Sequence, residues 1–196
     1  MSRRPVVIVI SNSTTPHRAF RNIADNISHI GYTTIHYVTY RSASSFTDAV
    51  LHVRDAINNI IRDMGQKIIL IGYSYGGFIA NNLAQFGWNI VDAIYIASPL
   101  TGTAVSDSIL REHFTWNTSH DQNFRNFRDI VYINRSVPLH KYFCITLGLF
   151  EFASDGFVKM KSACFGNRHH AHVAWTSHVF GLSDPRVAQI VANHLQ

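Results

Sequence analysis

The amino-acid sequence predicts an α/β fold in which a mostly parallel central sheet is covered by helices on both faces. Short apolar runs rich in β-branched residues alternate with segments whose apolar residues recur at helical spacing. This alternation is typical of right-handed strand–helix–strand units. The first run, residues 5–10 (PVVIVI), is continuously apolar, as expected for a strand buried on both faces. A length of 196 residues fits one compact domain spanning residues 1–196.

The first half of the chain continues with two strand–helix steps. Apolar residues at helical spacing predict a helix over 20–30, which Gly31 ends. The β-branched run 33–39 predicts the second strand. A long amphipathic helix is expected over 46–64, followed by Gly65 as its stop.

The remaining strands are expected at the centre and at the far end of the chain. Residues 67–73 form an apolar run that leads into a predicted helix over 75–86. Residues 90–97 (IVDAIYIA) predict the fourth strand, and 142–147 the fifth. A last strand is expected at 170–175 (HAHVAW).

Two further segments complete the expected organisation. Residues 185–195 predict a closing helix, with Asp184 as its N-cap and Pro185 as its first residue. Residues 101–138 are the least regular part, with one helix expected near 105–114. This segment leaves from a strand's carboxyl end, so we expect it to form a partial cap over the sheet, with Phe124 and Phe127 as an apolar face.

Composition excludes several classes of protein. No apolar run approaches the ~20 residues that span a bilayer, and the N-terminal MSRRPVVIVI lacks a signal-peptide cleavage pattern, so we expect a cytoplasmic protein. The net charge of +5 suggests weak attraction to anionic membrane surfaces. Basic residues are scattered, and no nucleic-acid-binding motif surrounds the densest basic stretch, 125–135. Cys144 and Cys164 lack metal-ligand spacing, which leaves buried thiols or one disulfide as the alternatives.

A serine stands between two glycines where the third strand gives way to a helix. Residues 70–80 read LIGYSYGGFIA, in which Gly72 and Gly76 flank Ser74 at two residues on either side. A nucleophile at the carboxyl end of a strand needs a tight strand-to-helix turn, and glycines remove the side chains that would collide. The N-terminus of the following helix points N–H groups toward a developing oxyanion. Ser74 is therefore the predicted nucleophile.

A serine nucleophile needs a base that is itself oriented by a carboxylate. In this architecture the acid and then the base follow the serine, each after a later strand. Asp155 and His178 occupy those places. The rival carboxylates are Asp121, Asp129 and Asp184, and the rival bases are His169, His170 and His172.

These motifs together resemble the α/β-hydrolase superfamily, and in particular its small serine lipases and esterases. The resemblance runs from PVVIVI through GYSYGG, SPLTGT and SDGFV to SHVFGLSDPRVAQIV. It implies a single-domain α/β-hydrolase fold, a triad of Ser74, Asp155 and His178, and no metal or cofactor.

One segment departs from the family pattern. Members usually carry His-Gly after the first strand, where a backbone N–H helps to form the oxyanion hole, whereas this chain reads Ser11-Asn12-Ser13. Tyr75 N–H is the expected first donor, and the second comes from Ser11, Asn12 or Ser13. Without a second donor the protein would be a catalytically degenerate hydrolase that serves as a binding protein.

The expected activity is hydrolysis of a small-molecule or lipid ester through an acyl-enzyme. Thioester or peptide cleavage would use the same triad, so the sequence leaves these reactions as alternatives to ester cleavage. Tyr73, Leu100 and Phe157 are the expected neighbours of an apolar acyl pocket. The sequence makes no prediction about oligomeric state.

Overall fold

The computed structural model describes residues 4–12, 15–40, 46–83, 86–98, 100, 142–148 and 170–196. Within these ranges six strands form one sheet in the order β2-β1-β3-β4-β5-β6, and each neighbouring pair is parallel. The strands are β1 (Val6–Asn12), β2 (Ile35–Tyr40), β3 (Ile68–Tyr73), β4 (Ile90–Ile96), β5 (Tyr142–Gly148) and β6 (His170–Ala174). The predicted parallel sheet is confirmed.

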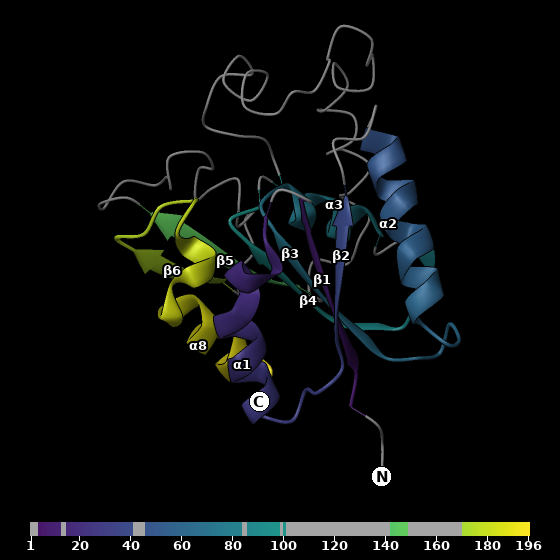
Figure 1. Cartoon of the computed structure of the whole chain (residues 1–196), viewed down its shortest axis with the longest axis horizontal. Helices are drawn as coiled ribbons and strands as arrows, with labels where there is room; N and C mark the ends of the chain where they lie inside the picture. Colours follow the sequence, from purple (N-terminus) through teal and green to yellow (C-terminus); the bar gives the residue numbers. More distant parts are fainter. Residues whose placement is uncertain are drawn as a thin grey trace, which may run out of the picture.

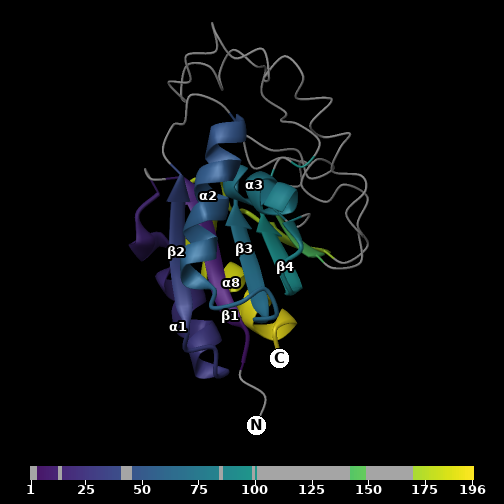
Figure 2. The same cartoon turned by 90° about the vertical axis from the view of Figure 1, so that its right-hand side faces the viewer.

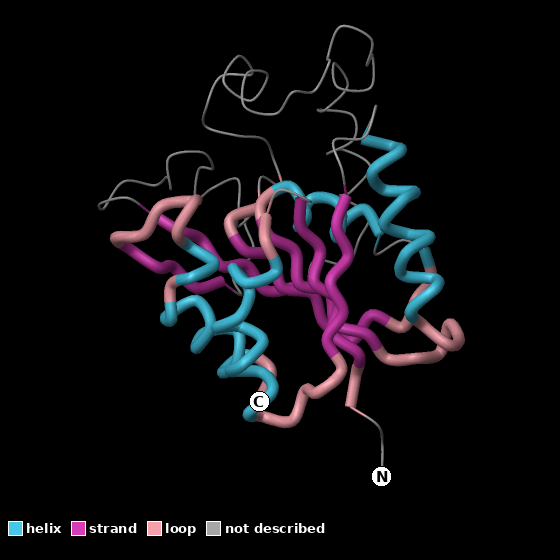
Figure 3. The backbone as a smooth tube through the Cα atoms, viewed as in Figure 1, coloured by secondary structure: helices cyan, strands magenta, loops and turns pink. Residues whose placement is uncertain are grey.

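Helices cover both faces of this sheet, as Figures 1 and 3 show. The helical elements are η1 (His17–Phe20), α1 (Arg21–His29), α2 (Phe46–Ile60), α3 (Tyr75–Leu83), η5 (Gly181–Ser183) and α8 (Pro185–His194). Helices α2 and α3 pack on one face, and α1 and α8 pack on the other. Figure 2 looks onto the α2 and α3 face, behind which the strands run in one direction. The three-layer α/β architecture is therefore the predicted one.

Strand β1 shows why a continuous apolar run belongs at the centre of this fold. Ile8 and Ile10 belong to the core under α2 and α3, whereas Val7 and Val9 belong to the core under α1 and α8. All four are at most 2% exposed. Successive side chains of a strand point to opposite faces, so both faces must be apolar here. Each such side chain contributes roughly 1.5–3 kcal/mol on burial.

Helix α2 and strand β1 end at residues other than those that the sequence predicts. Helix α2 ends at Ile60 rather than at residue 64, because polar side chains bind the backbone beyond it. The Asp63 carboxylate accepts from Gly65 N–H and the Gln66 side chain accepts from Arg62 N–H, both at 2.8 Å. Such local bonds compete with the helix. Strand β1 continues to Asn12 rather than ending at residue 10, because its pairing with β2 continues to Asn12 opposite Tyr40.

The predicted signals at the ends of two helices are confirmed. Gly31, with φ +98°, follows α1, and its N–H donates to the Ser28 carbonyl at 2.9 Å. Asp184 caps α8 by accepting from Arg186 N–H at 2.9 Å, and Pro185 is the first residue of the helix. A side-chain N-cap of this kind typically contributes about 1 kcal/mol.

Tyr32 contacts residues from both ends of the described chain. The buried Tyr32 hydroxyl donates to the Leu195 carbonyl at 3.2 Å, and the Arg4 guanidinium lies 5.0 Å from the centre of the Tyr32 ring. This contact ties the end of α8 to the start of the chain, far from the carboxyl ends of the strands. None of the described helices combines the length and apolarity needed to cross a bilayer.

Candidate active site

Ser74 lies on the turn between β3 and α3, at the carboxyl end of a central strand. Its backbone is left-handed, with φ +54°, and its N–H donates to the Ile96 carbonyl of β4 at 2.8 Å. Such a conformation costs a residue with a side chain about 1–3 kcal/mol and is concentrated at functional sites. It allows the chain to leave the strand and enter the helix within one residue, so the serine side chain stands at the strand end.

The two predicted glycines are required by close backbone packing. A Cβ on Gly72 would lie 2.5 Å from the nitrogen of Gly77, in the helix that follows. A Cβ on Gly76 would overlap the Ile10 carbonyl and lie 2.8 Å from its carbon. Gly77, which the sequence analysis did not single out, would place a Cβ 2.7 Å from the Cβ of Ser98. The turn is therefore wedged between β1 and the segment after β4.

His178 comes to Ser74 from the loop between β6 and α8, 104 residues later in the chain. Its Nε2 lies 2.7 Å from the Ser74 Oγ. That is an ordinary length for a strong hydrogen bond. The serine hydroxyl donates in this contact when the proton of the neutral imidazole is on Nδ1. The predicted nucleophile and the predicted base are thus in hydrogen-bond contact.

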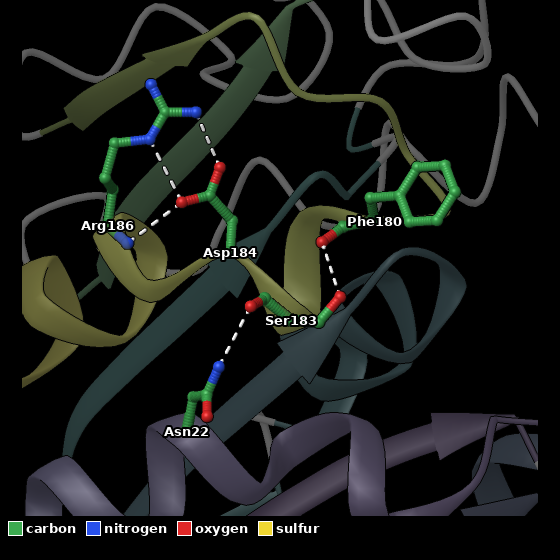
Figure 4. Close-up of polar contacts among 5 residues, drawn as sticks. All are labelled: Asn22, Phe180, Ser183, Asp184 and Arg186. Atoms are coloured by element: carbon green, nitrogen blue, oxygen red, sulfur yellow. Dashed lines mark hydrogen bonds and ion pairs between the residues drawn. The ribbon is translucent and has the colours of Figure 1, made fainter.

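The loop that carries His178 is held to the rest of the fold from several sides. At its start, Thr176 N–H donates to the Gly148 carbonyl of β5 at 3.0 Å. At its end, the Ser183 carbonyl accepts from the Asn22 side chain at 2.9 Å, and the Ser183 hydroxyl donates to the Phe180 carbonyl at 3.0 Å. Figure 4 shows this end of the loop, with Asp184 beside its Arg186 partner. The loop is therefore anchored on β5 at its start and on α1 at its end.

The expected oxyanion donors lie next to this turn. Tyr75 begins α3, so its N–H belongs to the helix N-terminus, while its ring is buried against Tyr40 and Phe78. Ser11 is fully buried at the end of β1, and a Cβ on Gly76 would lie 3.3 Å from its Cα. Burial and the nearby Tyr73 raise the pKa of the Tyr40 hydroxyl, which keeps that ring uncharged.

The alternating direction of backbone N–H groups along β1 indicates toward which neighbouring strand the Asn12 N–H points. Val6 N–H donates toward β3, to the Lys67 carbonyl, and Val7 N–H donates toward β2, to the Thr34 carbonyl. Backbone groups of successive strand residues point to opposite neighbours, so Asn12, an even number of residues after Val6, points its N–H to the β3 side. Pairing of β1 with β3 ends at Ile10 opposite Gly72. The Asn12 N–H therefore lies on the side of the Ser74 turn.

Two of the three residues expected near an acyl pocket are described. Tyr73 directs its hydroxyl to the His178 carbonyl, and its ring lies edge-on to Phe20, with the centroids 6.3 Å apart. Leu100 is 5% exposed and belongs to the core under α2 and α3. Phe157 lies outside the described residues.

The remaining candidates divide between described and undescribed parts of the chain. His172 directs Nδ1 to the Thr146 hydroxyl at 2.9 Å, within the sheet, and His170 begins β6. Asp184 is occupied by its helix and by Arg186, as a cap should be. The other candidates lie outside the described residues: Asp155, Asp121, Asp129, His169, Ser13, Cys164 and the segment 101–138 with Phe124 and Phe127. Cys144 is buried in β5.

Comparison with known proteins gives the same family as the motifs. The model of the alpha/beta hydrolase family matches residues 15–189. No curated protein sequence gives a significant match.

Solved structures of bacterial enzymes share the fold over nearly the whole chain. Bacillus licheniformis lipase BlEst2 in its mature form is similar with a TM-score of 0.71 at 16% identity, covering 97% of this chain and 91% of that one. The esterase EaEST from Exiguobacterium antarcticum has a TM-score of 0.59 at 12% identity, covering 100% and 93%. Est1E from Butyrivibrio proteoclasticus has a TM-score of 0.58 at 13% identity, covering 97% and 86%. At these identities the likeness is one of fold.

Proposed function

Because the chain belongs to the alpha/beta hydrolase family, we propose that it is a serine hydrolase that cleaves carboxylic esters, as lipases and esterases do. The observation that carries this proposal is the 2.7 Å contact between Ser74 Oγ and His178 Nε2. A hydroxyl is a weak nucleophile until a base within hydrogen-bond reach takes its proton. The substrate is a small-molecule or lipid ester, and the residues named here require no metal or cofactor.

The reaction proceeds in two half-reactions. Ser74 Oγ attacks the ester carbonyl as its proton passes to His178 Nε2, and the tetrahedral intermediate collapses when the imidazolium protonates the leaving alcohol. Water then attacks the acyl-enzyme and gives its proton to His178, after which that proton returns to Ser74 as the carboxylic acid leaves. Asp155 is proposed to orient the imidazole through its other nitrogen.

Backbone N–H groups are proposed to stabilise the oxyanion. The first is the N–H of Tyr75, at the N-terminus of α3, where the helix dipole adds positive charge. The second is the N–H of Asn12, which the alternation along β1 directs to the β3 side. The adjoining Ser11 keeps this strand end buried against the turn. With this main-chain donor from β1, the proposed oxyanion hole does not need the His-Gly pair of the family.

Labelling with a fluorophosphonate probe tests the nucleophile and the base together. We expect the purified protein to label at one serine, Ser74→Ala to lose labelling, and His178→Gln to slow it by about 10³-fold or more. Ser28→Ala on the exposed side of α1 and His172→Gln in β6 are matched controls that should label normally. A folded wild-type protein that fails to label would instead favour a binding protein built on a hydrolase scaffold.

The acid is tested by comparing three carboxylates in one assay. Asp155→Asn is expected to lower ester hydrolysis by about 10⁴-fold with the fold intact, whereas Asp121→Asn and Asp129→Asn leave it near the wild-type rate. A large loss of ester hydrolysis in Asp121→Asn or Asp129→Asn, with Asp155→Asn active, would assign the triad acid to that residue instead.

The chemical class of the substrate is read from a substrate panel. We expect p-nitrophenyl esters to be cleaved faster than matched thioesters or anilides, with acyl chain length showing the depth of the pocket. Preferential thioester or anilide cleavage would contradict the ester assignment while leaving the nucleophile in place.

A further inference from the structure

Tyr73 connects the predicted nucleophile to the predicted base through the protein itself. It is the last residue of β3 and directly precedes Ser74, yet its hydroxyl donates to the main-chain carbonyl of His178. The centroid of its ring lies 5.2 Å from that of the His178 imidazole, at an interplanar angle of 30°. One side chain therefore contacts both the backbone and the ring of the residue that must reach Ser74.

The residues that directly follow His178 have little apolar packing, although Leu182 near the end of the loop is buried. Val179 and Phe180, which follow His178, are 70% and 68% exposed. The hydrogen bonds of Thr176 and Ser183 fix the two ends of the loop, whereas the Tyr73 hydroxyl meets its middle. Polar contacts therefore hold the middle of the loop, where His178 lies.

Tyr73 itself is held by the buried core. Tyr73 is 8% exposed, belongs to the core under α1 and α8, and packs edge-on to the fully buried Phe20. Its Cα belongs to β3, and Ser74 follows directly in the chain. A bond from this side chain to His178 therefore sets the position of the base relative to the nucleophile rather than relative to solvent.

We infer that Tyr73 is a positioning residue that holds His178 within hydrogen-bond reach of Ser74. This inference rests on the proposed function. Catalysis is steeply sensitive to such placement, because a displacement of about 1 Å can cost roughly 10²-fold in rate. The hydroxyl contacts the His178 carbonyl, so its loss is expected to alter the chemical step more than substrate binding.

The test removes one hydroxyl and compares it with the same change elsewhere. Tyr73→Phe is expected to lower kcat for a p-nitrophenyl ester by about 10- to 100-fold with KM within about twofold of wild type. Tyr32→Phe is the matched control, because its buried hydroxyl also donates to a distant main-chain carbonyl, at Leu195, away from the site. We expect Tyr32→Phe to keep the wild-type kcat, and thermal melting compares the stabilities of the two variants.

A second readout follows His178 without turnover. In ¹³C-labelled protein, the His178 ring signals, assigned by their absence in His178→Gln, are expected to shift or broaden in Tyr73→Phe and to stay unchanged in Tyr32→Phe. Equal kcat in the two variants with unchanged His178 signals would overturn the inference, as would a raised KM with normal kcat. Loss of folding in Tyr73→Phe alone would assign the hydroxyl to folding and also overturn it. A wild-type protein without hydrolase activity would refute the proposed function instead, while the signals still report whether Tyr73 positions His178.

Discussion

Replacing Gly76 with alanine isolates the contact that wedges the nucleophile turn against the sheet. The new Cβ would overlap the Ile10 carbonyl and lie 2.8 Å from its carbon, where ordinary contact begins at 3.4 Å. The gap must therefore open by more than about 0.6 Å, because the Ile10 carbonyl oxygen lies closer than its carbon. Both sides resist this opening because Ile10 and Gly76 are buried backbone in β1 and α3. Overpacking of this kind costs about 1–3 kcal/mol, and we expect the upper end of that range.

The sign of the change in the free energy of unfolding distinguishes a steric collision from the helix propensity of alanine. Alanine is favoured over glycine in a helix by about 1 kcal/mol, so without the collision Gly76→Ala would stabilise the protein. Gly87→Ala is the matched control, because Gly87 has φ +79° but no atom within 4 Å of a new Cβ. It should cost only the left-handed strain of about 1–2 kcal/mol and leave ester hydrolysis unchanged.

Urea unfolding followed by circular dichroism measures the free energy of unfolding of both variants. Hydrolysis of a p-nitrophenyl ester measures their activity. Gly76→Ala is expected to unfold at lower urea and to lose about 10²-fold in rate, because the opening displaces Ser74 from its partners. A free energy of unfolding equal to or above that of the wild type would refute the packing argument.

Two further predictions concern neighbouring contacts. Gly77→Ala should lower the free energy of unfolding by about 2 kcal/mol. Adding Ser98→Gly to this variant should restore more than half of that loss, because it removes the Cβ that would lie 2.7 Å from the new methyl group. Strictly additive free energies of unfolding for the two changes would contradict this coupling. The hydrogen bonds from Arg186 hold the pKa of the Asp184 carboxyl below its ordinary value. A lowered pKa contributes stability that is present above the unfolded value of about 3.9 and is lost as pH falls through the lower folded value. Asp184→Asn, which keeps a good N-cap, should thus be less stable than wild type at pH 7 by a margin that narrows below about pH 4, and a margin independent of pH would refute the ion pair.

Local patterns along the sequence determined the elements and the nucleophile turn. The apolar run of β1, the glycines around Ser74 and the Asp184-Pro185 start of α8 are signals that act over a few residues, where periodicity and steric limits decide. The order of serine and histidine after their strands followed from the architecture that these elements imply. The positions of Ser74 and His178 were therefore predictable, and the structure brings the two side chains together.

Only the tertiary structure decided which distant groups meet. The sequence predicted Tyr73 only as a neighbour of the acyl pocket. Its contact with His178 depends on how β3 and the loop after β6 approach each other across 105 residues. The need for glycine at position 77 likewise arises from Ser98, on the neighbouring strand's continuation. Even the end of α2 depended on which backbone groups the Asp63 and Gln66 side chains bind. Periodicity fixes which face of an element is buried, whereas such contacts depend on the packing between elements and have no periodic signal in the chain.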